Sequence, residues 1–295
     1  MKVVFVVGTT ASGKSAYAFA EALRTGGAII NCDSVQLYQG LVIGSALPSE
    51  AEMNEVPHFL FSYVAKGSKM TAGQYARDFY ETMKKINNQF PIVYVVGGTG
   101  FYFQAIEKGL FDVQRPNSQL RNLIEDEMKT EVGAEKIYQE MITLDPLSAQ
   151  RIHRNDHYRI ARAVELMRVE KKPLSQIWNE FEEKKFKFPW ELKKIGIRQS
   201  KEALLERVKI RTQKMLNAGL IEEVTQILND QSIPNVQAWE ALQSVGYKEV
   251  VRYLQKDPEI SNLVTLQAKI IQNTMKLAKK QRTWFQRDQE IDWLE

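Results

Sequence analysis

Residues 8–15 read GTTASGKS, which is the G-x-x-x-x-G-K-S spacing of a loop that binds phosphate groups. Such a turn, placed between a strand and a helix, points several backbone N–H groups into one concavity, and the helix dipole adds partial positive charge. The Lys14 ammonium would bind terminal phosphate oxygens, and the Ser15 hydroxyl would bind Mg²⁺. The motif leaves open which molecule carries the phosphates. The predicted diphosphate-binding residues are Gly8, Thr9, Thr10, Ala11, Ser12, Gly13, Lys14 and Ser15.

A carboxylate follows another apolar run, in NCDSVQLYQG (31–40). P-loop NTPases normally carry a metal-ordering aspartate behind a second strand, but PIVYVV (91–96) is followed by glycines, which leaves Asp33 as the nearest candidate. Asp33 could bind a metal, accept a proton from an attacking group, or only shape a turn. Ser34 and Gln36 beside it favour a functional crevice, because a glutamine amide can pair with the edge of an adenine.

A second glycine-rich turn, GGTGFYFQA (97–105), also lies between a predicted strand and a predicted helix. Its glycines would let the backbone approach a ligand closely, and Thr99 would offer a hydroxyl at the tip. A tight turn without a ligand is an equally good interpretation of this stretch taken alone.

The strands and helices that must position these residues can be predicted from the sequence, in which short apolar runs alternate with stretches of helical periodicity. This alternation predicts βαβ units and a buried parallel sheet. The strand pattern gives way to helical periodicity from about residue 115, and 193–199 looks like a strand that returns to the sheet. The predicted strands of the first hundred residues are 2–7, 28–32, 58–64 and 91–96.

The predicted fold class is therefore α/β, with a P-loop-containing parallel sheet core that is flanked by helices and interrupted by a helical insertion domain. We place the first part of the core at residues 1–114 and the helical insertion domain at 115–189. The second part of the core, with basic C-terminal helices, is placed at 190–295.

Composition excludes several classes of protein. Lys and Arg total 40 against 36 for Asp and Glu, so the formal net charge is only +4 and any nucleic-acid surface must be local. No apolar run approaches the roughly 20 residues of a membrane helix, and the N-terminus lacks a secretory signal. Cys32 is the only cysteine, which excludes an internal disulfide and a cysteine-rich zinc site. We expect a cytoplasmic monomer that does not enter a membrane.

Three stretches in this order, GTTASGKS, DSVQLY and GGTGFYFQA, resemble the tRNA dimethylallyltransferases, also called tRNA isopentenyltransferases. Later segments look like further blocks of that family: NDHYRIARAVE, RVKIRTQKMLNAGLIEEV, VGYKEVVRYL and LAKKQRTWFQR. The resemblance implies that a dimethylallyl group passes from dimethylallyl diphosphate to the exocyclic amine of the adenosine 3′ of a tRNA anticodon. The phosphate loop would then hold the leaving diphosphate of a prenyl donor.

The resemblance also implies a role for individual residues. Asp33 would take the proton from the attacking amine, and Thr99 would lie beside the reacting centre. Arg121 and Arg211 would approach the diphosphate or the reacting base, although without the family both look like ordinary helix-surface charges. The residues implied to hold the adenine are Ser34, Val35 and Gln36.

Basic segments predict how the tRNA anticodon stem-loop is held. An adenine stacked in that loop must be flipped out, which costs a few kcal/mol that other contacts offset. Residues 151–172 carry seven basic side chains against three acids, and the resemblance of YRIAR places Tyr158, Arg159 and Arg162 on the tRNA. Residues 268–287 carry six basic side chains and no acid. Lysine stands at 276 and 280, where the family often has arginine; it keeps the charge but lacks the planar fork that a bidentate phosphate contact requires.

Two other functions remain open on the residues alone. In a P-loop kinase for a small molecule or nucleotide, Asp33 would activate a hydroxyl and the helical insertion would act as a lid, so ATP would be consumed. In an RNA-binding module, the loop would be a passive anion site, and RNA affinity would be indifferent to Asp33.

Overall fold

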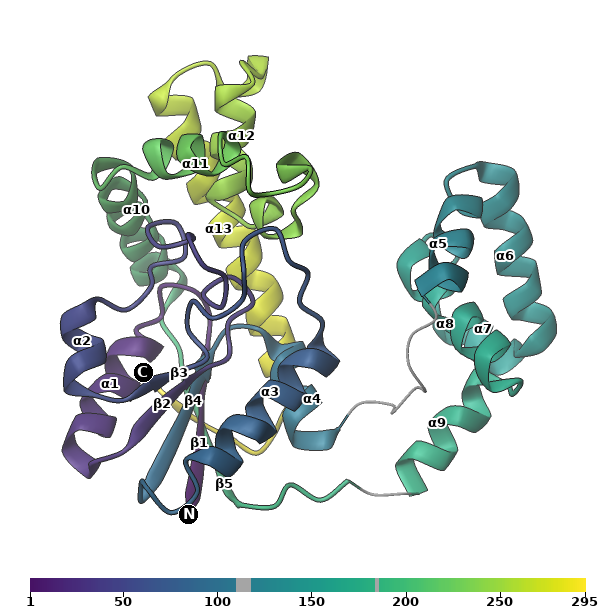
Figure 1. Cartoon of the computed structure of the whole chain (residues 1–295), viewed down its shortest axis with the longest axis horizontal. Helices are drawn as coiled ribbons and strands as arrows, with labels where there is room; N and C mark the ends of the chain where they lie inside the picture. Colours follow the sequence, from purple (N-terminus) through teal and green to yellow (C-terminus); the bar gives the residue numbers. More distant parts are fainter. Residues whose placement is uncertain (110–117, 184–185) are drawn as a thin grey trace. The chain divides into compact units, whose positions relative to one another are not determined.

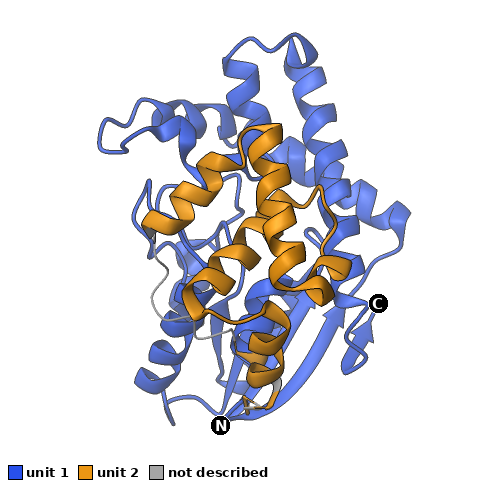
Figure 2. Ribbon diagram, turned by 90° about the vertical axis from the view of Figure 1, so that its right-hand side faces the viewer, with its two compact units in different colours: residues 1–107, 188–295 blue, residues 108–187 orange. Residues whose placement is uncertain are grey.

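The computed structural model describes residues 1–109, 118–183 and 186–295. The chain divides into two compact units, one formed by 1–107 with 188–295 and the other by 108–187 (Figure 2). The predicted start of the helical insertion, at residue 115, lies outside the described residues. The domain boundaries derived from the sequence therefore stay predictions.

A six-stranded parallel sheet forms the centre of the first unit (Figure 1). Its spatial order is β3-β2-β4-β1-β5-β6, and in β1 the five residues 3–7 are all buried, as expected for a parallel strand covered on both faces. The predicted α/β class with a parallel sheet is confirmed. The strands are β1 (Lys2–Gly8), β2 (Ala28–Asn31), β3 (His58–Phe59), β4 (Ile92–Gly97), β5 (Glu191–Ile197) and β6 (Ile291–Leu294).

Two details of the sheet differ from the sequence prediction. The strand predicted at 58–64 ends at Phe59, because Leu60 and Ser62 have positive φ angles of 61° and 47°, which no extended strand can contain. The edge strand β6 was not predicted, since its four residues, IDWL, include two that are exposed and one that is only half-buried and form no continuous apolar run.

Helices cover both faces of the sheet. Neighbouring residues of a strand point to opposite sides, so the apolar side chains of β1 need a covering layer on each face. Ala18 of α1 (Lys14–Thr25) packs with Val4 on one face. On the other face, the ring of Phe5 lies 4.9 Å from that of Phe103 in α4 (Gly100–Lys108). Phe103 in turn contacts Phe285 at the end of α13 (Leu263–Phe285), with 6.0 Å between ring centroids. The remaining helices of this unit are α2 (Glu50–Glu55), α3 (Ala72–Lys85), α10 (Lys201–Asn217), α11 (Leu220–Leu228), α12 (Tyr247–Leu254) and α13 (Leu263–Phe285).

Helices α10 and α13 pack against each other and carry side chains toward the phosphate loop. Helix α10 begins after Ser200, whose hydroxyl accepts a hydrogen bond from the backbone N–H of Ala203 at 3.1 Å, as an N-cap does. Leu204 and Val208 of α10 pack with Ala278 of α13 in one apolar cluster.

The second unit is built from helices throughout its described residues. Ile137 and Val164 lie in its buried core. The buried Asp145 carboxylate joins distant parts of this unit, because it accepts hydrogen bonds from the backbone N–H groups of Ser148 and Ser175 at 3.2 and 2.6 Å. Within the described parts of the chain, no helix is both long and apolar enough to cross a membrane. The helices of this unit are α5 (Ser118–Glu127), α6 (Glu131–Leu144), α7 (Pro146–Arg151), α8 (His157–Glu170) and α9 (Leu174–Glu183).

Candidate active site

Three neighbouring strands end at the same edge of the sheet, and each is followed by one of the predicted site segments. The phosphate loop follows β1, Asp33 follows β2, and Thr99 follows β4. The hydroxyl of Thr99 accepts a hydrogen bond from the backbone N–H of Ser34 at 3.0 Å. Glycine is required at position 97, because a Cβ there would lie 1.9 Å from the carbonyl oxygen of Cys32. The structure thus brings the two glycine-rich turns and the acidic segment together.

The phosphate loop has the geometry of an anion site. Gly13 has a φ of 101° and begins α1, whose first-turn N–H groups have no intrahelical acceptor. The Lys14 ammonium donates to the carbonyl oxygen of Thr9 at 3.2 Å. Burial lowers the pKa of Lys14 to about 8; the Asp33 carboxylate opposes this shift, and the Arg211 guanidinium adds to it. Desolvation and the neighbouring guanidinium therefore favour the neutral form of Lys14 more than the Asp33 carboxylate favours its charged form.

The Asp33 carboxylate is oriented by its own turn. Its Oδ1 accepts from the backbone N–H of Val35 at 2.9 Å, and its backbone N–H donates to the side-chain oxygen of Asn31 at 2.9 Å. Among the residues that the structure describes, none donates to Oδ2 of Asp33. The Gln36 amide nitrogen donates to the carbonyl oxygens of Ser45 and Ala46, so only its oxygen is left for a base. Asp33 thus presents one oxygen that can accept a proton.

Two arginines of α10 face the phosphate loop. Arg211 donates to the hydroxyl of Thr10 and to the carbonyl oxygen of Ser45, both at 3.4 Å. Burial lowers the pKa of Arg211, and the Asp33 carboxylate opposes this shift. Arg207 donates to the carbonyl oxygen of Ala11 at 2.8 Å. The sequence analysis missed Arg207, although its position four residues before Arg211 puts both on one helix face.

Gln281 of α13 is another residue that the sequence analysis missed. Its side-chain oxygen accepts from the backbone N–H of Thr10 at 2.8 Å, and its nitrogen donates to the carbonyl oxygen of Gly98 at 3.0 Å. One side chain therefore ties the phosphate loop to the second glycine-rich turn. Only its place among helical residues is visible in the sequence, and nothing local marks the contact.

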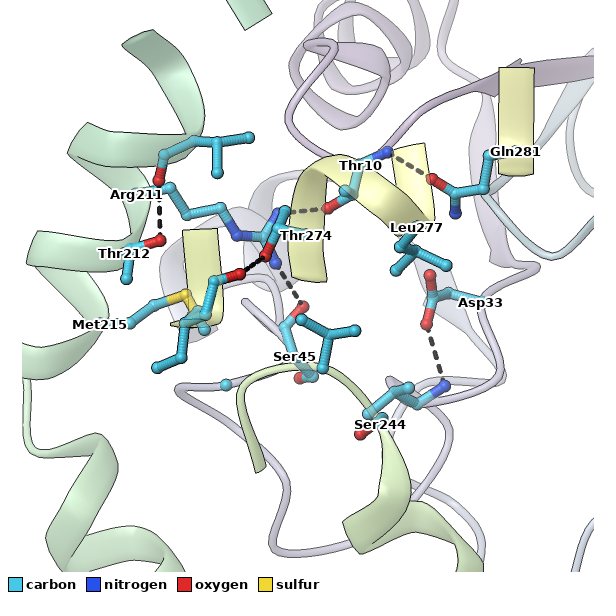
Figure 3. Close-up of a pocket in the computed structure, with 15 residues that line it drawn as sticks. Thr10, Asp33, Ser45, Arg211, Thr212, Met215, Ser244, Thr274, Leu277 and Gln281 are labelled. Carbon is cyan, nitrogen blue, oxygen red and sulfur yellow. Dashed lines mark hydrogen bonds between the residues drawn. The ribbon is translucent and has the colours of Figure 1, made fainter. Parts of the chain in front are cut away.

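Two adjoining pockets open at this edge of the sheet. The polar pocket is lined by Lys14, Ser15, Asp33, Gln36, Arg207 and Arg211. The apolar pocket has a wall of Val208, Met215, Val245, Ile270 and Leu277. Thr10, Asp33, Ser45 and Arg211 line both pockets, and Figure 3 shows Arg211 and Met215 on one side of the apolar pocket with Asp33 on the other. A phosphate group and an apolar group of one ligand could therefore occupy these two adjacent spaces.

The second unit holds the other predicted residues. Arg121 pairs with Glu125 at 2.7 Å, and its guanidinium carbon lies 5.9 Å from the ring centroid of Tyr158. Arg159 is largely exposed beside Asp156, the N-cap of α8. Arg162 pairs with the buried Glu165. Arg121 and Tyr158 thus belong to one cluster. The approach of Arg121 to the diphosphate or the reacting base stays a prediction, as do the tRNA contacts of Tyr158, Arg159 and Arg162.

The basic stretch 268–287 lies largely on α13. Lys276, Lys279 and Lys280 are exposed. Phe285 is buried, while Trp284 is 37% exposed and packs its ring edge-on against Phe101. One face of α13 thus presents three lysine side chains that phosphate groups could contact.

Comparison with known proteins identifies the family. Residues 36–288 match the family model described as IPP transferase. A tRNA dimethylallyltransferase of Bdellovibrio bacteriovorus is 48% identical over 99% of this chain and 92% of its own length. One of Geobacter metallireducens is 36% identical over 100% of this chain and 92% of its own.

A solved structure agrees with these relatives. The tRNA delta(2)-isopentenylpyrophosphate transferase of Staphylococcus epidermidis superimposes with a TM-score of 0.67 at 28% identity, over 99% of this chain and 92% of its own. The resemblance inferred from short motifs is therefore confirmed along the chain, and the chain belongs to the IPP transferase family.

Proposed function

We propose that this chain transfers the dimethylallyl group of dimethylallyl diphosphate to the exocyclic amine of the adenosine 3′ of the anticodon in tRNA. The observation that carries the proposal is the position of Asp33, which lines both the polar and the apolar pocket. A proton acceptor, an anion site and an apolar wall thus meet at one place. Membership in the IPP transferase family favours this reaction over a P-loop kinase and over a passive RNA-binding module.

The polar pocket holds the leaving group. When the C–O bond of the donor breaks, negative charge accumulates on the diphosphate. Fixed dipoles and cations around a site that excludes water stabilise such charge most strongly. The first-turn N–H groups of α1, Lys14 and Arg211 are already in place for this task.

Mg²⁺ fits the same pocket. Magnesium usually keeps several waters and binds proteins through few oxygens together with substrate phosphates. The Ser15 hydroxyl, which lines the polar pocket at the start of α1, is the protein oxygen that would hold it. When bound, the ion neutralises part of the diphosphate charge.

Asp33 is the general base of the transfer. The adenine amine is a poor nucleophile, because its lone pair is delocalised into the ring, and it becomes acidic as it attacks. The C–N bond forms, the diphosphate departs with the electrons of the C–O bond, and the amine proton passes to Asp33. Ser34 and Thr99 hold the turn around this carboxylate through their mutual hydrogen bond.

The apolar pocket accepts the isoprenoid tail of the donor. Met215 and Leu277 lie on its wall, and Arg211 lines both this pocket and the polar one. Burial of a branched five-carbon group against such side chains contributes about 25 cal/mol per Å² of apolar surface. The tail would thereby fix the reacting carbon between the diphosphate and Asp33.

The tRNA is held by basic side chains of both units. The exposed Tyr158 and Arg159 would contact the anticodon stem-loop, as would the lysines of α13. Arg121 and Arg162 would join them, if the nucleic acid competes with Glu125 and Glu165 for their guanidinium groups. Such contacts offset the cost of flipping the adenine out of its stack.

One assay tests the proposed reaction. The protein is incubated with Mg²⁺, unmodified tRNA and radiolabelled dimethylallyl diphosphate, and in parallel with labelled ATP. Label should move from the prenyl donor to tRNA, and Asp33→Asn should lower kcat by about 10²–10⁴-fold while donor and tRNA still bind. Asp292→Asn, at an exposed carboxylate of the edge strand β6, is the matched control. Consumption of ATP without prenyl transfer would refute the proposal.

A further inference from the structure

Glu223 of α11 holds a loop that borders the active site. Its Oε2 accepts from the backbone N–H groups of Val42 and Ile43 at 3.1 and 2.7 Å. Its Oε1 accepts from the N–H of Gly44 at 3.2 Å. One carboxylate is thus bound by three consecutive amides from a segment about 180 residues earlier in the chain. Charge-assisted hydrogen bonds of this kind are stronger than neutral ones.

Tyr247 of α12 extends this arrangement by one residue. Its hydroxyl donates to Glu223 at 2.8 Å and accepts from the N–H of Ser45 at 3.2 Å. The side chain is fully buried, and a Cβ on Gly44 would lie 2.5 Å from its ring. Burial, and then the charge of Glu223, raise the pKa of Tyr247 far above its usual range, so the hydroxyl remains a donor. Four successive amides, 42–45, are therefore fixed by two side chains.

The fixed loop contacts two residues of the proposed machinery. The carbonyl oxygen of Ser45 accepts from Arg211 at 3.4 Å and from Gln36 at 3.2 Å. The carbonyl oxygen of Ala46 accepts from Gln36 at 2.8 Å. The orientation of Arg211, which faces the diphosphate, and that of Gln36, which faces the base, therefore depend on where these two carbonyl groups lie.

We propose that Glu223 and Tyr247 are positioning residues for prenyl transfer, acting through the loop 42–46 on Arg211 and Gln36. This inference rests on the proposed function, and neither residue is assigned a contact with substrate. An arrangement that only stabilised the fold would not need to end on the backbone carbonyl that accepts from Arg211, a half-buried arginine of the proposed active site. Loss of the anchor would let Ser45 move, and Arg211 would lose the partner that fixes its guanidinium beside Thr10.

Isosteric variants test the inference on a folded protein. Tyr247→Phe removes the hydroxyl, and Glu223→Gln removes the charge and turns a donor toward the amides. Glu222→Gln, at the exposed neighbouring carboxylate, and Tyr253→Phe, on the same helix as Tyr247, are matched controls. If Glu223→Gln does not fold, Tyr247→Phe carries the test. All variants are assayed well below their unfolding temperatures.

The diagnostic measurement is a double-mutant cycle on the dissociation constant of dimethylallyl diphosphate, obtained by calorimetry without tRNA. Tyr247→Phe should raise this constant about tenfold in the unaltered background and less than about twofold in an Arg211→Lys background, because the hydroxyl acts through Arg211. It should lower kcat and leave the KM for tRNA within about twofold, since phosphate contacts are untouched. The controls should match the unaltered protein in every measurement.

Two results would overturn the inference. Equal effects of Tyr247→Phe in both backgrounds would mean that the residue does not act through Arg211. If Tyr247→Phe lowered the unfolding temperature but left donor binding and kcat unchanged, Tyr247 would have only a structural role. Failure of the unaltered protein to transfer the prenyl group would instead refute the proposed function, so the two failures are distinguishable.

Discussion

Donor binding should weaken as the pH rises through about 8, because Lys14 must be protonated to hold a diphosphate. In the unliganded pocket, burial lowers the pKa of Lys14 from 10.5 to about 8. A bound anion favours the charged form of Lys14, so the pKa of Lys14 rises on binding. Affinity for the donor is therefore lost only above the pKa that Lys14 has in the free protein. If only the ammonium form binds, the dissociation constant rises about tenfold between pH 7 and pH 9. An ordinary lysine would change it by less than about 5% over that range.

Calorimetric titration with dimethylallyl diphosphate at fixed Mg²⁺, from pH 7 to pH 9.5, measures this effect. Lys14→Arg is the control, since a guanidinium stays charged throughout this range and its profile reports only the ionisation of the donor and of other groups. The unaltered protein should lose affinity above pH 8 while the variant stays flat. Parallel profiles of the two proteins, or a flat profile for both, would refute the assignment of Lys14 as a titrating cation in the donor site.

Three further perturbations follow from the structure. Leu277→Ala should raise the dissociation constant of dimethylallyl diphosphate about tenfold and leave that of inorganic diphosphate unchanged, because only the prenyl tail reaches the apolar pocket; equal changes for both ligands in calorimetry would argue against that placement. Gly44→Ala should lower the free energy of unfolding by about 1–3 kcal/mol, since the new Cβ meets the Tyr247 ring at 2.5 Å, as denaturant titration would measure. Replacing Lys276 and Lys280 together by alanine should reduce the slope of log affinity for tRNA against log salt by about one per lost phosphate contact, and an unchanged slope in filter binding would place the tRNA elsewhere.

The sequence predicted those features that local pattern determines. The phosphate loop is visible because its chemistry requires eight consecutive positions, and the strand before it and helix after it follow from apolar periodicity. The meeting of Asp33 with Thr99 could also be expected, since the carboxyl ends of parallel strands share one edge of the sheet. Adjacent placement of β2 and β4 is what makes the contact between Thr99 and Ser34 possible.

Contacts made across long stretches of chain could not be predicted in this way. Gln281 reaches the amide of Thr10 from 271 residues away, and its type is equally common on exposed helix faces. Glu223 looks like any acidic residue in the first turn of a helix, where the dipole alone would favour it. Its actual partners are amides of another segment, and only the packing of α11 against that segment reveals them.

In the proposed reaction, such distant residues distinguish a prenyl diphosphate from a nucleotide. The loop motif specifies only an anion, since its amides and Lys14 would serve any pair of linked phosphates. The polar pocket adjoins an apolar wall whose members Met215 and Leu277 belong to α10 and α13, 200 or more residues beyond the loop. An apolar wall beside the phosphate site offers few partners to a ribose and a good surface to a branched hydrocarbon. The same loop can therefore occur in both classes of protein, and the helices that close over it decide which donor the pocket accepts.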